Sequence, residues 1–299
     1  MPELSVMRAP HSILVPGHLD FPVLARIREG ILVQTGGIDA LREKFPTLIR
    51  EAIDFVLDPV RTARTQLGDL DKIEKTFIGL KVEHFVRDML DVPKGVRDLR
   101  IAGVDVDIKY SVKGDWMIPP ETFSREEPCL VIASDENTHQ CWLGLIIARQ
   151  AYLNAPNRDG KRSVSAAAFQ NILWLVDGVP YPKSRWIGLN MERLRELRKI
   201  RGGKKRAVAF FSENLRKPIH RVVVQSLLFN QLDYMKRLRA NGGARDELRK
   251  RGIALLSGIY DSALIAELKL QPLDREETMA VAPADAAEEA FMRMKGVIV

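Results

Sequence analysis

The sequence contains little cysteine. Its 299 residues include only Cys129 and Cys141. Two thiols do not make a disulfide framework, nor do they supply the four ligands of a structural zinc site. Both lie in apolar stretches, PCLVIA and CWLGLIIA, a setting typical of small buried hydrophobic residues. Such sparing use of cysteine indicates a reducing compartment, so we expect a cytoplasmic protein.

Long hydrophobic runs are also absent. No stretch of about 18 apolar residues occurs, which excludes a predicted membrane span. The N-terminal stretch MPELSVMRAPHSILVPGHLD lacks a basic segment followed by an apolar core, so we predict no secretory signal. The chain has no visible internal repeat, and 46% of its residues are hydrophobic. This composition is typical of a globular protein with room for two domains.

Positive charge is concentrated in one part of the chain. Residues 191–251 hold 18 Lys and Arg against 6 Asp and Glu, a balance of +12, whereas the whole chain has a net charge of +7. A basic block beside a neutral-to-acidic remainder is the electrostatic footprint of phosphate binding. The alternative is a solvated helix face whose charge the acidic remainder balances in three dimensions.

The first third of the chain predicts an arm followed by helices. Residues 1–20 are rich in proline and predict an N-terminal arm. Helical spacing follows over residues 37–58, with a break at Pro46. The clearest helix is predicted over residues 71–91. We expect its apolar stripe to comprise Ile73, Phe77, Leu80 and His84.

Short extended runs follow this helix. They are DLRIAG (98–103), VDVDIKYS (104–111), PCLVIAS (128–134) and CWLGLIIA (141–148). A further helix is predicted over residues 163–178, opened by a serine cap and closed near Gly178. The order of helix, strands and helix predicts an α/β domain over residues 21–178, in which helices flank a mixed sheet.

A linker over residues 179–194 is expected to lead into a second, mainly α domain, residues 195–299. Here residues 220–229 predict a helix. Residues 231–252 predict two short helices split by Asn241-Gly242-Gly243, the pattern of a helix-turn-helix with glycine at its turn. The alternative is an ordinary helical hairpin with charged outer faces.

The rest of the second domain is consistent with a winged form of that motif. Residues 252–258 predict a wing strand, and residues 262–270 predict a closing helix. The chain after Pro272 is rich in Ala and Glu, and we expect it to be weakly ordered or helical.

The stretch VDVDIKYS carries the candidate chemistry. Side chains two apart on a strand point to the same face, so Asp107 and Lys109 lie side by side. If the chain turns at Gly103, Asp98 returns to the neighbourhood of Asp107. The same hairpin would place Asp105 opposite Arg100 or Ala102, so Asp105 is not among the candidate site residues. The alternative is a wet strand face with no catalytic role.

Carboxylates and a lysine at one point suit phosphodiester hydrolysis. Two or three carboxylates can hold a divalent metal beside the phosphate, and magnesium prefers such oxygen ligands. A lysine can orient the attacking water or stabilise the charged phosphate. Glu83, on the predicted helix 71–91, is an acid on an otherwise apolar flank and is the candidate third carboxylate.

The residues resemble a known family. A helix with a glutamate, a strand opened by aspartate and a strand with D-x-K resemble the PD-(D/E)xK nuclease core. The sequence is more similar to NaeI-type restriction endonucleases. The segments that carry this resemblance are DKIEKTFIGLKVE (71–83), VDVDIKYSVKGDWMIPPE (104–121), NRDGKRSVSAA (157–167) and YMKRLRANGGARDELRKRGI (234–253). Arg97 stands where the proline of the "PD" pair is usual.

The resemblance implies a homodimeric, magnesium-dependent type II enzyme that cuts double-stranded DNA. It also implies a winged helix-turn-helix domain that binds a second, effector copy of DNA, as in type IIE enzymes. Asp98, Asp107 and Glu83 then correspond to metal ligands, and Lys109 to the catalytic lysine. The candidate DNA-binding residues are Arg158, Lys161, Arg162, Lys236, Arg237, Arg245, Arg249 and Lys250.

Two other functions stay open at this level. One is a DNA-binding regulator whose nuclease-like domain is inert. The other is a repair nickase that uses the same chemistry on one strand. Trp116, which follows the catalytic strand, either wedges at DNA or packs in the core.

Overall fold

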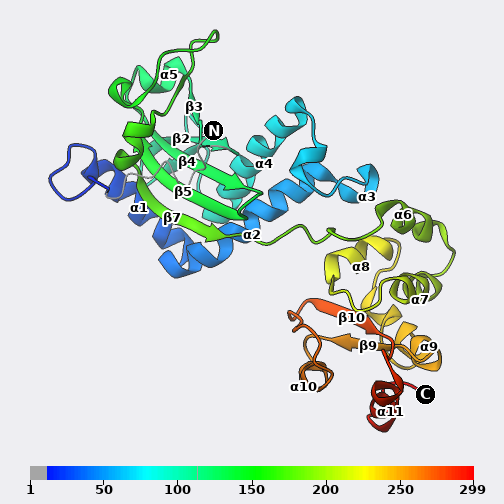
Figure 1. The fold of residues 1–299 in the computed structure, drawn as a ribbon. Coiled ribbons are helices and arrows are strands. Elements are labelled where there is room, and N and C mark those ends of the chain that lie inside the picture. The colour runs from blue at the N-terminus through cyan, green and yellow to red at the C-terminus, as the bar shows by residue number, and fades with distance from the viewer. Residues whose placement is uncertain (1–11, 113) are drawn as a thin grey trace. The chain divides into compact units, whose positions relative to one another are not determined.

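The computed structural model describes residues 12–112 and 114–299, so the predicted arm of residues 1–20 lies largely outside the described chain. The chain divides into two compact units (Figure 1). Unit 1 consists of the residues up to Leu57 together with Gln66–Ser184, and unit 2 consists of Asp58–Thr65 and Arg185–Val299. The division after Ser184 falls inside the predicted linker. The segment Asp58–Thr65, expected in the first domain, belongs to unit 2.

Unit 1 is built on a five-stranded mixed sheet of order β1-β2-β4-β5-β7. Its strands are β1 (Leu99–Ile101), β2 (Val104–Ser111), β4 (Pro128–Asp135), β5 (Gln140–Ile147) and β7 (Leu173–Pro180). Strand β2 runs parallel to β4, and the other neighbouring pairs are antiparallel. The predicted α/β class with a mixed sheet is confirmed.

Three long helices cover one face of this sheet (Figure 1). They are α1 (Phe21–Thr35), α2 (Ile38–Leu57) and α4 (Lys72–Leu90). Strand residues alternate between faces, so Leu130 and Ile132 of β4 pack under the helices while Val131 packs on the opposite side. Asp71 caps the N-terminus of α4, because its carboxylate accepts a hydrogen bond from the amide of Glu74 at 2.8 Å.

The opposite face of the sheet is covered by short elements. They are β3 (Met117–Ile118), α5 (Pro120–Phe123), η2 (Gln150–Tyr152), β6 (Arg162–Ser163) and η3 (Ala166–Asn171), with η1 (Leu67–Asp69) elsewhere in the unit. Trp116 is fully buried in this layer, against Phe169 and Trp174, and its Nε1 donates to the carbonyl of Ile132 at 2.6 Å. Trp116 is therefore a core residue and not a wedge at DNA.

Three expectations for unit 1 were wrong. Residues 163–178 form no long helix: η3 is short, and β7 follows it because its Leu, Trp and Val residues suit a strand that pairs with β5. Helix α2 continues through Pro46, since its burial of apolar side chains outweighs one lost hydrogen bond. The predicted stripe of α4 is exposed, and the buried stripe consists of Ile78, Val82, Val86 and Leu90.

Unit 2 surrounds a three-stranded antiparallel sheet of order β8-β10-β9. Its strands are β8 (Ile219–His220), β9 (Ala254–Ser257) and β10 (Glu277–Val281). Its helices are α3 (Pro59–Thr62), α6 (Met191–Lys199), α7 (Gly203–Glu213), α8 (Arg221–Leu227), η4 (Met235–Arg237), α9 (Ala244–Lys250), α10 (Ser262–Glu267) and α11 (Ala286–Met294). Leu255 faces a core with α7 and α8, whereas Leu256 faces a second core with α10 and α11.

The basic region differs from expectation in one helix. Helices α8, α9 and α10 and strand β9 form where the sequence predicts them. The first helix of the predicted pair is only the 3-10 turn η4, because Leu238 is the one buried side chain of residues 231–240. The chain after Pro272 is ordered as β10 and α11, and its strand was missed. Within residues 12–112 and 114–299, no helix is both long and apolar enough to span a membrane.

Gly144 gives a test of the packing in unit 1. A Cβ at this position of β5 would lie 2.4 Å from Cγ2 of Ile172 and 2.8 Å from Cε3 of Trp174. We expect Gly144→Ala to lower the free energy of unfolding of unit 1 by about 1–3 kcal/mol, since a packed core resists an added methyl group. Urea titration followed by tryptophan fluorescence measures this. Gly68→Ala is the control, because its Cβ meets nothing within 4 Å, and an equal loss in both variants would contradict the packing argument.

Candidate active site

The site lies where β1 stops pairing with β2. The pairing of these strands covers only Val104–Val106 of β2. One residue before β1, the Oδ2 atom of Asp98 accepts a hydrogen bond from the amide of Ile108 at 2.7 Å. The Asp98 carboxylate therefore takes the position that a carbonyl of a longer β1 would occupy. This brings Asp98 beside Asp107, as the hairpin around Gly103 predicts.

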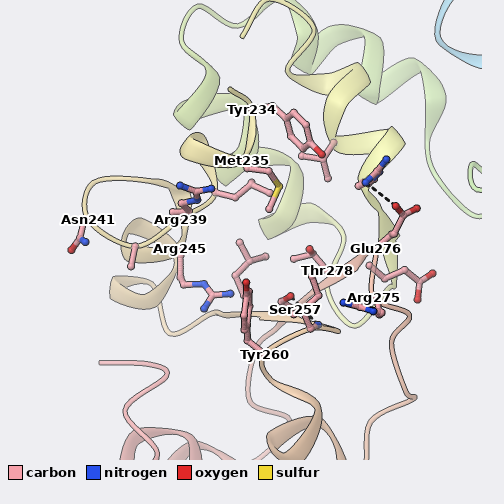
Figure 2. A pocket seen from close by; sticks show the side chains of 17 residues that line it. Tyr234, Met235, Arg239, Asn241, Arg245, Ser257, Tyr260, Arg275, Glu276 and Thr278 are labelled. Carbon is pink, nitrogen blue, oxygen red and sulfur yellow. Dashed lines mark hydrogen bonds and ion pairs between the residues drawn. The ribbon is translucent and has the colours of Figure 1, made fainter. Parts of the chain in front are cut away.

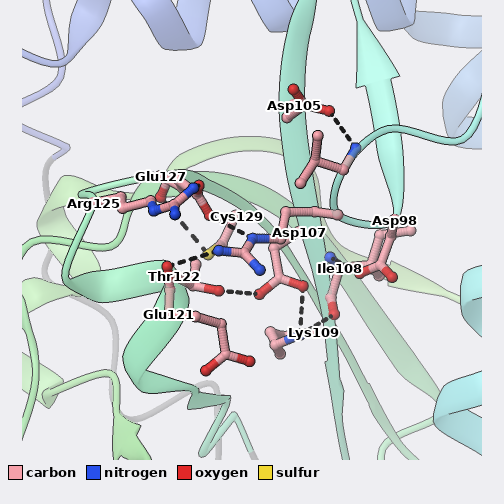
Figure 3. Close-up of polar contacts among 12 residues, drawn as sticks. Asp98, Asp105, Asp107, Ile108, Lys109, Glu121, Thr122, Arg125, Glu127 and Cys129 are labelled. Atoms are coloured by element: carbon pink, nitrogen blue, oxygen red, sulfur yellow. Dashed lines mark hydrogen bonds and ion pairs between the residues drawn. The ribbon is translucent and has the colours of Figure 1, made fainter.

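Asp107 and Lys109 form an ion pair on one face of β2 (Figure 3). Lys109 Nζ lies 2.6 Å from Asp107 Oδ1 and 2.9 Å from the carbonyl oxygen of Ile108. The second oxygen of Asp107, Oδ2, accepts a hydrogen bond from Thr122 Oγ1 at 3.0 Å. Asp107 is buried, so both of its oxygens rely on these partners.

Helix α4 supplies the third carboxylate. Burial, together with the negative charge of Asp98, raises the pKa of Glu83 to about 7, while Lys109 opposes this shift. Burial also raises the pKa of Asp107, again against the pull of Lys109. One turn after Glu83, Arg87 Nε donates to the carbonyl of Asp98 at 3.2 Å and ties α4 to the site. Three acids and a lysine thus share one electrostatic environment.

Asp105 has a different task from Asp107. Its Oδ1 accepts a hydrogen bond from the amide of Val96 at 2.7 Å (Figure 3). The carboxylate thereby closes the turn that leads to Asp98, and a Cβ on Gly95 would lie only 2.1 Å from the same oxygen. Asp105 is accordingly a structural residue of the loop.

Comparison with known proteins identifies the family of the chain. The family described as "Restriction endonuclease NaeI" matches residues 34–291. The chain is 31% identical over 268 residues to the type II restriction enzyme NaeI of Lentzea aerocolonigenes, covering 84% of this chain and 81% of that enzyme. The chain belongs to the NaeI restriction endonuclease family. As a family member, it is a site-specific deoxyribonuclease whose candidate acids and lysine lie together in unit 1.

Some side chains that support the candidate site of this NaeI-family chain were not selected from the sequence. Arg97 Nε pairs with Glu127 Oε2 at 2.6 Å, and Arg97 Nη2 donates to the carbonyl of Glu121 at 2.7 Å. Thr122, on the short helix α5, reaches Asp107 across the crossover between β2 and β4. No spacing rule predicts a contact between residues 107 and 122, so only the fold reveals it.

Two of the three candidate metal ligands lie close together. In the part of the chain that the structure describes, no group of three or more His, Cys, Asp or Glu side chains is close enough to hold a metal ion. Asp98 and Asp107 nevertheless lie side by side. The Lys109 ammonium already occupies a position between Asp107 Oδ1 and the carbonyl of Ile108, two oxygens that attract a cation.

The predicted DNA-binding residues of unit 1 occupy an exposed turn and its exit. Asn157 Oδ1 accepts hydrogen bonds from the amides of Asp159 and Lys161 and shapes the turn. Arg158 and Lys161 are exposed on it. Arg162 lies over the ring of Phe123, 5.2 Å from its centroid, next to Thr122 of α5. The turn and its exit therefore pack against α5, the helix that carries Thr122.

The predicted DNA-binding residues of unit 2 lie on η4 and α9. Lys236 and Arg237 belong to η4, while Arg245, Arg249 and Lys250 belong to α9. Beside them is a cavity of about 810 Å³ (Figure 2), whose lining includes the buried residues Val224 and Leu255. Tyr234 and Tyr260 line this cavity. So do four arginines, Arg221, Arg239, Arg245 and Arg275.

The two cysteines give a test of the burial around the site. Cys129 pairs in register with Asp107 and is fully buried, and burial raises the pKa of its thiol well above the usual value. Burial likewise raises the pKa of Cys141 to about 12. We expect neither thiol to react with Ellman's reagent at pH 8 in the folded protein, and both to react in urea. Rapid reaction of either thiol in the folded protein would contradict this packing, and Cys141→Ser would show which of the two thiols reacts.

Proposed function

We propose that this restriction endonuclease cuts double-stranded DNA in a magnesium-dependent reaction, with Glu83, Asp98, Asp107 and Lys109 as its catalytic residues. The observation that carries the proposal is the meeting of Asp98 and Asp107 at the point where β1 leaves β2, with Lys109 on the same face. An acid–acid–lysine set of this kind suits phosphodiester hydrolysis.

The residues present fit a magnesium ion. Magnesium prefers oxygen ligands and binds through one or two carboxylates while keeping several waters. Asp98, Asp107 and the carbonyl of Ile108 offer such oxygens, and the raised pKa values of Glu83 and Asp107 reflect negative charge crowded into a buried place. Bound magnesium would supply positive charge at the scissile phosphate and lower the pKa of a water.

The protein side chains have separate roles in this proposal. Asp98 and Asp107 hold the ion, and Glu83 is the further carboxylate that faces it from α4. Lys109, whose ammonium is free to leave Asp107 when the ion neutralises that carboxylate, stabilises the charge on the phosphate or orients the attacking water. The ion pair between Asp107 and Lys109 holds the lysine side chain in place before DNA binds.

Unit 2 is proposed to be a winged helix-turn-helix domain that binds an effector copy of DNA, which makes the enzyme type IIE. The order α7, β8, α8, α9, β9 and β10, with β10 between β8 and β9, supports a winged helix. In that arrangement α9 is the recognition helix, and residues 258–276 form the wing. The basic side chains Arg245, Arg249 and Lys250 of α9 supply phosphate contacts.

The cavity in unit 2 supports the same role. It opens between η4, α9 and the start of the wing, and Figure 2 shows Arg239, Arg245 and Arg275 around it. Arg221 pairs with Glu276 at 2.7 Å, and Arg245 lies 3.5 Å from Asp261. The arginines can pair with the phosphates of a DNA strand, and the tyrosines and apolar lining can pack against its sugars.

We also propose that the active enzyme is a homodimer. Two strands of opposite direction need two attacks, and a two-fold dimer provides two copies of the site. Helix α4, which carries Glu83, leaves Ile73, Phe77 and Leu80 exposed at 71%, 52% and 50%. Such a row of exposed apolar side chains supports the proposal that a second copy of the chain covers this face of α4.

The central test compares Asp107→Asn with Asp105→Asn. We expect Asp107→Asn to lower the rate of double-strand cleavage in magnesium roughly 10²-fold or more, since several kcal/mol of transition-state stabilisation depend on the bound ion. Asp105→Asn should keep the wild-type rate, because an amide oxygen still accepts from Val96. Gel assays on mixed DNA, with sequenced fragment ends, measure cleavage and the recognition site.

Other outcomes of that assay identify other functions. Nicks in one strand only would indicate a repair nickase. No cutting by the wild-type protein on any DNA, methylated or unmethylated, would indicate a DNA-binding regulator with an inert nuclease-like domain.

The effector role predicts a change in salt dependence. The double variant Arg249→Ala/Lys250→Ala should bind duplex DNA more weakly. Its plot of log affinity against log salt should be shallower by about 0.9 for each phosphate that the variant no longer neutralises. A cognate duplex added in trans should stimulate the wild type and fail to stimulate the variant. The control is Arg195→Ala/Lys199→Ala on α6, with the same charge change. An equal effect in both variants would move the binding surface away from α9.

A further inference from the structure

We infer that Thr122 is a positioning residue for the metal ligand Asp107, and that Arg97 completes the frame that holds Thr122 in place. The inference rests on the proposed magnesium-dependent function and adds residues that lie outside the acid–acid–lysine set. It starts from the contacts of α5, the four-residue helix in the crossover between β2 and β4.

Thr122 decides how the Asp107 carboxylate is oriented. The threonine is fully buried, and its hydroxyl donates to Asp107 Oδ2 at 3.0 Å. Lys109 binds the other oxygen at 2.6 Å (Figure 3). The buried hydroxyl therefore fixes Oδ2 and leaves Oδ1 as the oxygen whose partner can change from the lysine to a metal ion. Hydrogen-bonded partners of liganding carboxylates orient them in this way.

Backbone contacts fix the position of Thr122 itself. The amide of Thr122 donates to the carbonyl of Pro119 at 3.0 Å, and its own carbonyl accepts from the amide of Glu127 at 3.1 Å. Glu127 also accepts Arg97 Nε at 2.6 Å, and the carbonyl of Glu121 accepts Arg97 Nη2 at 2.7 Å. Arg97 thus binds residues on both sides of Thr122, namely Glu121 and Glu127.

The frame links the two metal-binding carboxylates. Arg97 directly precedes Asp98, so the residue that grips α5 is covalently joined to one carboxylate, while Thr122 touches the other. Arg97 and Glu127 are each only 18% exposed, and a partly buried, two-point guanidinium contact is geometrically specific. Arg97 accordingly ties the turn before Asp98 to the helix that orients Asp107.

The experiment measures metal binding apart from cleavage. Thr122→Val keeps the shape and removes the hydroxyl, and Thr122→Ser keeps the hydroxyl. We expect Thr122→Val to weaken Mn²⁺ binding by the DNA-free protein about 10- to 100-fold. Electron paramagnetic resonance of the free ion measures this affinity. The magnesium concentration for half-maximal cleavage should rise by the same factor. Thr122→Ser should restore both values, and Arg97→Gln should shift them in the same direction as Thr122→Val.

Controls separate positioning from folding. Ser124→Ala, at an exposed position just after α5, should leave both values unchanged. If Thr122→Val does not fold, as judged by circular dichroism and thermal unfolding, Thr122→Ala removes the hydroxyl without adding a methyl group in its place.

Two results discriminate the inference from the proposed function. Unchanged Mn²⁺ affinity in folded Thr122→Val or Thr122→Ala would overturn the positioning role if Asp107→Asn abolishes binding in the same assay. Unchanged Mn²⁺ affinity in Asp107→Asn itself would instead overturn the metal site.

Discussion

The hydrogen bond from the amide of Ile108 to the Asp98 carboxylate is the interaction on which the site depends. Strand β1 is short, and its pairing with β2 ends at Leu99 and Val106. The next amide of β2 on that edge would be unpaired, and an unpaired buried amide costs about 1–3 kcal/mol. The carboxylate of Asp98 satisfies this amide at 2.7 Å. A requirement of the sheet thus holds an acid against Asp107, in spite of the repulsion between two negative charges.

The same interaction explains why the surrounding charges are arranged as they are. Crowding the carboxylates into a buried place raises the pKa values of Glu83 and Asp107, because their charged forms lose hydration and repel each other. Lys109 offsets part of this cost, and Arg87 binds the backbone of Asp98 without entering the site. The candidate site is therefore a buried cluster of carboxylates whose negative charge Lys109 offsets only in part.

Sequence reasoning predicted which candidate side chains lie together, because the rules it used are local. The period of a strand places Asp107 beside Lys109, and a tight turn at Gly103 returns Asp98 to them. It failed where tertiary contacts decide the structure. Residues 163–178 become a strand through pairing with β5, and the apolar stripe expected on α4 is its exposed face. The contact of Thr122 with Asp107 was not visible, because it depends on how a crossover folds back across the sheet.

That crossover has a consequence for how the enzyme can vary. Parallel strands demand that the chain return from the end of β2 to the start of β4, and the start of β4 lies beside Asp107. Residues 114–127 make most of this return; Trp116 is buried within it, and Arg97 and Glu127 form an ion pair at its end. The segment is both a core layer and a wall of the candidate active site, so an insertion in it would disturb the packing of Trp116 and the contact of Thr122 with Asp107 together. An insertion in the exposed turn around Arg158 would leave the sheet intact.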